Sequence, residues 1–169
     1  EPTLSANGRF VAFTTPSGDL VSDDTNGALD VFVKDLDTGE IVRANTAADG
    51  TQARGRAVNF DSSLSLSADG RTVAFVSPAY NLVPNDTNGE LDVFVKNLDT
   101  GEIVRVSTAA DGMQTNGEVA DAHLSADGRY VTFESDADNL VPDDTNGEWE
   151  VFVRSLDTGE IVRVNTAAD

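Results

Sequence analysis

A short acidic motif occurs three times in the chain, and its composition is that of a calcium-binding loop. In the first copy, oxygen-bearing side chains stand at Asp24, Asn26 and Asp30, with Gly27 between them. This spacing matches four of the five fixed positions of the pattern D-x-D-x-D-G-x-x-D, in which oxygen ligands two residues apart converge on one ion. The sequence thus offers three candidate calcium sites, formed by Asp24, Asn26 and Asp30; by Asp86, Asn88 and Asp92; and by Asp144, Asn146 and Glu150.

The same motif is also typical of a hydrogen-bonded turn. The leading aspartate of the calcium pattern is replaced in every copy, by Ser22, Pro84 and Pro142. A neighbouring side chain could supply the lost ligand, namely Asp23, Asn85 or Asp143. In the alternative, Asp-Thr-Asn-Gly is an Asx-stabilised turn, and Asp30 accepts hydrogen bonds from backbone N–H groups of the loop. We favour the turn, because short motifs match by chance.

Catalytic chemistry has little support in the composition. The chain has no cysteine and one histidine, His123, which we expect on the surface. A Cys-His dyad and a metal site with several histidines are therefore excluded. No G-x-S-x-G context accompanies the serines. The carboxylates recur in register in every repeat, whereas catalytic residues are usually unique, so the sequence predicts a protein that is not an enzyme.

Two sets of arginines recur in phase with the acidic motif. They are Arg43, Arg105 and Arg163, and Arg9, Arg71 and Arg129. We expect them to form structural ion pairs with acids of neighbouring strands or blades; a ligand-binding ring of arginines is the alternative. Trp149 and Tyr80 are not repeated and are the better candidates for a specific contact.

These motifs are carried by an internal repeat. The segments LSANGRFVAF, LSADGRTVAF and LSADGRYVTF begin at Leu4, Leu66 and Leu124, and DTNG and LDTGEIVR recur with the same offsets. We divide the chain into repeats at 1–50, 51–112 and 113–169. The repeats differ in length between Gly50 and Ser63, which predicts a surface loop there.

Each repeat is predicted to form four short strands. In the second repeat, Asp92–Lys96 and Glu102–Val106 are rich in β-branched and aromatic residues, and Gly, Asp, Asn and Pro fill the gaps. Runs such as Val31-Phe32-Val33 have no polar face, so these sheets need cover on both sides. The fold class is therefore all-β, with four-stranded antiparallel sheets stacked as the blades of a β-propeller.

The motifs L-S-[AD]-[DN]-G-R-x-V-x-F, D-T-N-G-x-x-[DE]-V-F-V and D-x-x-T-G-E also resemble a known family. They are similar to the WD-repeat-like propeller repeats of the TolB type, and to a subgroup of bacterial exported proteins with NLVPxDTNGxxDVFV in each blade. The resemblance covers nearly the whole chain. It implies a propeller, usually of six or more blades, that is extracellular, at the cell surface or periplasmic, and that binds or scaffolds rather than catalyses.

Charge narrows the range of partners. The chain has 30 acidic and 11 basic residues and a net charge of −19. The negative electrostatic potential of such a chain repels nucleic acid and anionic membranes and favours binding of cations and basic partners. No apolar run approaches the length of a membrane helix. The expected partners are a protein or glycan ligand, or further copies of the chain itself, with calcium as the single candidate cofactor.

Three blades do not close a ring, and this predicts assembly. We expect the valine pairs of the third strands to be buried between blades, namely Val31/Val33, Val93/Val95 and Val151/Val153. The end repeats show no polar caps, so an isolated chain is predicted to expose apolar faces. A second copy, a fibre of copies, or further sequence of a longer protein would cover them. The leading hypothesis is a non-enzymatic binding or scaffold module; the alternatives are a self-assembling structural subunit and, with least support, a glycan-active enzyme.

Overall fold

The computed structural model describes residues 2–54 and 63–166. Most of the length-variable segment that we predicted to be a surface loop, residues 55–62, lies outside this range. The described residues form three four-stranded sheets and contain no helix, and hence none that could cross a membrane. The strands are β1 (Thr3–Leu4), β2 (Phe10–Thr15), β3 (Asp30–Asp35) and β4 (Ile41–Arg43); β5 (Leu64–Leu66), β6 (Thr72–Ser77), β7 (Asp92–Asn97) and β8 (Ile103–Arg105); and β9 (Val119–Leu124), β10 (Tyr130–Ser135), β11 (Glu150–Ser155) and β12 (Ile161–Arg163).

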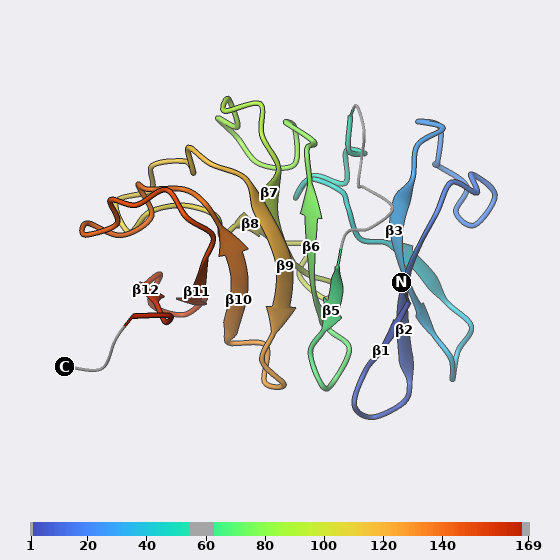
Figure 1. The fold of residues 1–169 in the computed structure, drawn as a ribbon. Coiled ribbons are helices and arrows are strands. Elements are labelled where there is room, and N and C mark those ends of the chain that lie inside the picture. The colour runs from blue at the N-terminus through green and yellow to red at the C-terminus, as the bar shows by residue number, and fades with distance from the viewer. Residues whose placement is uncertain (1, 55–62, 167–169) are drawn as a thin grey trace.

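Each sheet is an antiparallel meander in which consecutive strands pair, so the predicted all-β fold of four-stranded blades is confirmed. Figure 1 shows the three sheets side by side, with the first blade on the right and the third on the left. The first strands of the blades lie next to one another, since β1 contacts β5 and β5 contacts β9. β9 carries a bulge at Asp121, whose φ is 50°, opposite the Thr132–Glu134 segment of β10; the sequence did not indicate it.

The blades stack through two different faces. The back face of the second blade carries Ala74, Val93 and Val95, and its front face carries Val73, Phe75 and Phe94, because side chains alternate along each strand. The back face of each blade packs against the front face of the next. One buried cluster accordingly joins Val31 and Val33 to Phe75 and Phe94, and a second joins Val93 and Val95 to Phe133 and Phe152. Small side chains therefore meet aromatic rings at both blade contacts.

The end of the third blade differs from what we predicted. Val31, Val33, Val93 and Val95 are buried, as expected. Val151 and Val153 are only half-buried, so that part of the prediction is wrong. The reason is that they lie on the back face of the last described blade, where no further front face covers them.

The third back face is also less apolar than the internal ones. Thr132 and Glu134 stand where the second blade has Ala74 and Val76. The expectation that the end repeats show no polar caps thus needs a correction for the third blade, whose back face carries one charged side chain, Glu134.

A turn glycine sets the closeness of the first blade contact. Gly70, in the turn between β5 and β6, has a φ of +74° and lies against the Phe10 ring of the first blade. A Cβ atom on Gly70 would come within 2.2 Å of Phe10 Cδ2. Only glycine combines this backbone conformation with so close an approach.

We predict that Gly70→Ala destabilises the protein far more than Gly39→Ala. Both glycines have positive φ, but a Cβ atom on Gly39 would meet nothing within 4 Å. Gly39→Ala should cost about 1 kcal/mol for the backbone conformation alone. Gly70→Ala should add about 1–3 kcal/mol from overpacking against Phe10. Urea unfolding of the two variants measures the difference, and equal losses would contradict this packing of the first two blades.

Candidate functional site

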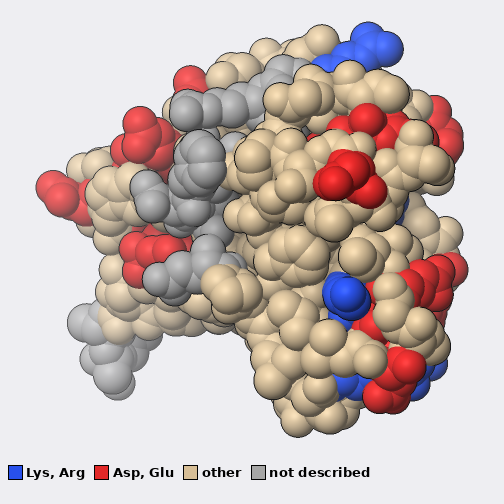
Figure 2. Space-filling view, turned by 90° about the vertical axis from the view of Figure 1, so that its right-hand side faces the viewer, with Lys and Arg blue, Asp and Glu red and all other residues tan. Residues whose placement is uncertain are grey.

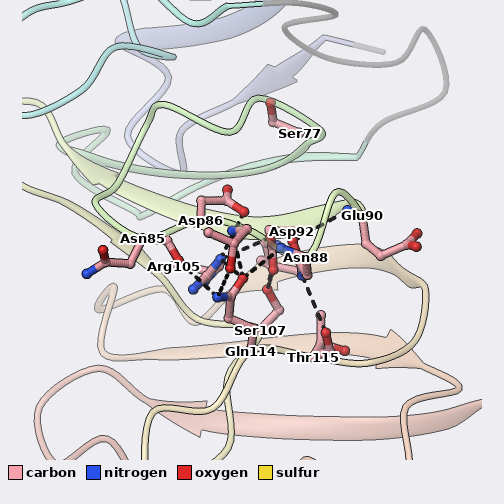
Figure 3. A network of polar contacts seen from close by, with 12 residues as sticks. Ser77, Asn85, Asp86, Asn88, Glu90, Asp92, Arg105, Ser107, Gln114 and Thr115 are labelled. Carbon is pink, nitrogen blue, oxygen red and sulfur yellow. Dashed lines mark hydrogen bonds and ion pairs between the residues drawn. The ribbon is translucent and has the colours of Figure 1, made fainter.

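The acidic motif folds into a loop that is held by an arginine from the same blade. Figure 3 shows the middle copy, in which Asp86 comes from the β6–β7 loop, Asp92 begins β7 and Arg105 ends β8. Arg105 Nη1 lies 3.1 Å from Asp86 Oδ1 and 3.4 Å from Asp92 Oδ2. The three side chains are almost completely buried, with exposed fractions of 9%, 5% and 0%. This is a buried ion-pair cluster, which we call the arginine clamp.

The clamp recurs in the other two blades. Arg43 Nη1 lies 3.3 Å from Asp24 Oδ1, and Arg163 Nη1 lies 3.3 Å from Asp144 Oδ1. Arg163 also lies 2.8 Å from Glu150 Oε1. The prediction of structural ion pairs is thus confirmed for these arginines, and in each case the pair joins elements of one blade.

Asparagine forms the predicted turn beside each clamp. Asn26 Oδ1 accepts a hydrogen bond from the Ala28 N–H at 2.9 Å. The second and third copies show the same bond from the residue two positions later, at 3.4 Å for Asn88 and 3.3 Å for Asn146. The Asx turn is therefore present in all three blades.

The prediction for Asp30, the second carboxylate of the motif, is wrong. Asp30 Oδ1 accepts hydrogen bonds from the side-chain amides of Asn26 and Asn45, at 3.1 Å and 2.5 Å, rather than from backbone N–H groups of the loop. In the middle copy, Ser107 Oγ donates to Asp92 Oδ1 at 2.5 Å. The second acid thus ties the loop to the chain that leaves the fourth strand.

A glutamine that the sequence analysis missed completes the middle clamp. Gln114 Oε1 accepts hydrogen bonds from the backbone N–H groups of Thr87 and Asn88 and from Arg105 Nη1, at 3.0–3.1 Å. Its Nε2 donates to Asn85 O and Thr87 Oγ1, both at 2.9 Å. Gln52 holds the first loop through Thr25 in the same way. The recurrence of T-A-A-D-G-x-Q at 46–52 and 108–114 was the available signal.

Burial shapes the electrostatics of the clamp. Burial raises the pKa of Asp92, while Ser107 and Arg105 act in the opposite direction. Burial likewise raises the pKa of Asp86, which also feels the charge of Asp92. The guanidinium group thus compensates two carboxylates that are costly to bury as ions.

The three candidate calcium sets lie at these clamps, with arginine at their centre. In each blade the structure brings the two acids and the asparagine of the motif together, but a guanidinium already pairs with both acids in the second and third copies and with Asp24 in the first. Within the described residues, no three His, Asp or Glu side chains are arranged to hold a metal ion. Calcium binding stays the less favoured alternative and is untested, and an ion would have to displace the arginine.

The second arginine set also forms ion pairs, and these arginines, unlike those of the clamps, are exposed. Arg9, Arg71 and Arg129 pair with Asp35, Asp99 and Asp157 at 2.5–2.6 Å. The pair with Arg9 lowers the pKa of Asp35 well below its usual range, chiefly through the hydrogen bond. These pairs join neighbouring strands of one blade, as predicted.

Two of these pairs border a groove of about 390 Å³ between the first and second blades. Phe10, Val42 and Leu98 contribute apolar surface to it, and charged side chains of both blades line the rest. Tyr80, Trp149 and His123 are not among its lining residues; all three are exposed, as expected for His123.

Comparison with known proteins identifies the fold. No protein-family model matches the chain, and no curated protein sequence matches it. Among solved structures, TolB from Agrobacterium tumefaciens superimposes with a TM-score of 0.54 at 19% identity, over 95% of this chain and 46% of that one. The β-propeller domain of the Trilobed protease from Pyrococcus furiosus gives 0.51 at 10% identity, over 96% and 40%. Dipeptidyl peptidase 4 from Porphyromonas gingivalis gives 0.55 at 16% identity, over 99% and 26%.

The chain spans less than half the length of each of these structures. At such identities the likeness shows the fold alone, which is the β-propeller that the sequence motifs implied. The architecture is shared between TolB and peptidases, so it does not by itself distinguish binding from catalysis.

We predict that Arg105→Gln costs about 3–5 kcal/mol of stability, because it leaves Asp86 and Asp92 buried without a counter-charge. Arg71→Gln is the matched control; Arg71 pairs with Asp99 on the surface, and the loss there should stay below about 1 kcal/mol. Urea unfolding measures both. Similar losses for the two variants would show that the clamp is not the main electrostatic constraint.

The pH dependence of Arg105→Gln should be opposite to that of ordinary acid denaturation. Burial raises the pKa of Asp92, and loss of Arg105 should raise it further. The folded state then binds a proton more readily than the unfolded chain, so stability falls as pH rises between the ordinary value near 4 and the raised one. Lowering the pH from neutral to about 5 should therefore restore part of the lost stability of the variant relative to wild type.

We also predict that calcium leaves the melting temperature of the wild-type chain unchanged, because Arg43, Arg105 and Arg163 already supply the positive charge. Thermal unfolding in millimolar calcium and in EDTA tests this. A rise with calcium that EDTA reverses, and that Asp86→Ala with Asp92→Ala reduces, would instead establish the calcium sites.

Proposed function

We propose that this chain, three blades of a TolB-like β-propeller fold, is a non-enzymatic binding or scaffold module that works outside the cytoplasm. One observation carries the proposal. The acidic clusters that could take part in catalysis form the arginine clamps instead. These clamps recur in every blade, and their carboxylates are paired with an arginine that holds the loop.

The burial of the clamp supports a structural role. A general acid or a nucleophile must reach its substrate, whereas the Asp92 side chain is fully buried and hydrogen-bonded. Three equivalent copies in three blades also fit a role in folding better than a role at one active centre. The surfaces of the blades are therefore the places where this chain would act.

The groove between the first two blades offers a concave surface for a ligand. Its charged lining comprises four carboxylates, Asp35, Glu40, Asp69 and Asp99, against the two guanidinium groups of Arg9 and Arg71. The whole chain, these side chains included, has a net charge of −19. A basic peptide with an apolar side chain matches this surface, because the acids attract its lysines and the apolar floor accepts the side chain.

The proposed location rests on the sequence motifs. Their resemblance to repeats of exported bacterial proteins supports a place outside the cytoplasm. A strongly acidic surface is compatible with that location and keeps the chain away from nucleic acid and anionic membranes.

A second candidate function is self-assembly into a ring or fibre. The observation that favours it is the uncovered back face of the third blade, where Val164 is 48% exposed, while the equivalent Val106 of the second blade is 1% exposed. A glycan-active enzyme remains the least supported function, since no unique pair of carboxylates in a cleft stands out among the described residues.

The proposed binding can be tested with a short peptide in which two lysines flank a leucine. We expect calorimetric titration to show binding that weakens with salt, and a glutamate analogue of the peptide should not bind. Glu40→Lys should weaken binding several-fold through charge repulsion in the groove. Glu160→Lys, the equivalent change in the third blade and away from the groove, should leave it unchanged.

Absence of catalysis is tested separately. The purified chain is incubated with a panel of peptides and oligosaccharides, and products are sought by mass spectrometry against a heat-denatured control. We expect no products beyond the control. Turnover that co-purifies with the folded chain would overturn the non-enzymatic function. If neither peptide binds in the calorimetric titration, the groove is not the binding site.

A further inference from the structure

The two ends of the described structure are complementary halves of the contact that joins its blades. Each internal contact uses three features: a cation that crosses to the preceding blade, a side chain that lies on a turn glycine of the next blade, and an apolar back face against an aromatic front face. All three occur in unpaired form at the two ends.

The first feature is the crossing cation. Lys96 Nζ of the second blade donates hydrogen bonds to Thr46 O and Ala47 O of the first blade, at 2.9 Å and 3.2 Å. Arg154 Nη1 of the third blade likewise donates to Thr108 O of the second.

Lys34 occupies the equivalent position in the first blade. It makes no hydrogen bond or ion pair with any described residue. Thr166, at the far end, corresponds to Thr46 and Thr108. The donor and the acceptor of a third crossing contact are thus present at opposite ends of one chain.

The second feature is the side chain on the turn glycine. Phe10 lies on Gly70 of the next blade, and Thr72 lies on Gly128, where a Cβ atom would come within 3.6 Å of Thr72 Cβ. Tyr130 is the equivalent of Phe10 and Thr72 in the third blade and is 45% exposed. A Cβ atom on Gly8, the equivalent glycine of the first blade, would meet nothing within 4 Å.

The third feature is the pair of apolar faces. Val11 and Phe13 on the first front face are half-buried, whereas the equivalent Val73 and Phe75 are fully buried at an internal contact. Figure 2 shows the first-blade end of the molecule; much of its middle is uncharged, although the chain is strongly acidic. The third back face presents Val151, Val153 and Val164.

We propose that a second copy of this chain docks its first blade onto the third blade, head to tail, and repeats the internal blade contact. This deepens the self-assembly candidate and rests on it. Lys34 of one copy donates to the Thr166 carbonyl of the other, and Tyr130 packs on the partner copy's first turn glycine. The second copy is the favoured occupant because its own first blade carries the cation, the glycine and the aromatic front face together.

One charged side chain and the net charge of the chain make this contact weaker than an internal one. Glu134 lies on the third back face where the second blade has Val76, so docking brings a carboxylate toward an apolar surface. Each copy also carries a net charge of −19, which makes the copies repel at low salt. Association should therefore be reversible and should strengthen with ionic strength.

A disulfide across the new contact tests the geometry, since the chain has no cysteine. The Ala68 N–H donates to Ala126 O at 2.7 Å across the internal contact, and Ala6 is the equivalent residue of the first blade. The variant Ala6→Cys with Ala126→Cys should form intermolecular disulfides after diamide oxidation, whereas either single variant should not form the head-to-tail ladder. The variant Ala68→Cys with Ala126→Cys is the internal control and should link within one chain.

Light scattering at micromolar concentration provides the second readout. Wild-type chain should exceed the mass of a monomer, as a dimer if two copies close a ring or as longer species if they stack openly. Lys34→Glu should weaken association about tenfold or more, because it removes a charged donor and adds a repulsive carboxylate. Arg54→Glu, the same charge change on an exposed loop residue, should not.

The outcomes separate the two levels of the proposal. A wild-type monomer at low and high salt would overturn self-assembly altogether and would leave the end faces to other blades of a longer protein. Assembly that persists in Lys34→Glu and yields no Ala6–Ala126 cross-link, while the internal control does link, would overturn only this interface.

Discussion

The structure depends on one constraint, which is that every sheet has apolar side chains on both faces. In β7, Val93 and Val95 point to one side and Phe94 to the other, and all three are buried. A four-stranded sheet of this kind cannot leave either face in water without losing about 25 cal/mol for each Å² of apolar surface exposed. Stacking of blades is therefore a condition for the strands to form, and the pairing of alanine and valine with phenylalanine sets how closely they stack.

The arginine clamps act on a different problem, the long loop between the second and third strands. A loop of this length has many alternative paths, and apolar packing does not distinguish them well. Arg105 collects Asp86 from the loop, Asp92 from β7 and Gln114 from the segment that leads to the next blade. Buried ion pairs add little net stability but penalise arrangements that leave a charge unpaired. The clamp thus fixes the loop and the exit of the chain toward the following blade.

Sequence periodicity was enough to predict the strands, the blades and the ion-pairing of the recurring arginines, because each of these is repeated and local. The sequence could not show that Arg105 lies inside the acidic motif, since the two are brought together only by pairing of β7 with β8. Gln114 was missed because its segment recurs only twice, at 46–52 and 108–114, and the recurrence does not reveal that the glutamine reaches back to the loop before β7. The burial of Val151 was predicted wrongly for another reason: burial depends on the neighbouring blade, and the residue itself does not reveal whether one is there.

Most basic side chains of this protein take part in structural contacts, whereas most acidic side chains lie on the surface. Six arginines are held in ion pairs within blades, and Lys96 and Arg154 bind carbonyl groups of the preceding blade. Structure therefore uses eight of the 11 basic side chains, while most of the 30 acids are left to the surface. The resulting field acts over about 8 Å at physiological salt and repels every other copy of the chain. Short-range complementarity between blade faces must overcome that repulsion, so ionic strength controls whether the acidic surface meets a basic partner or another copy of itself.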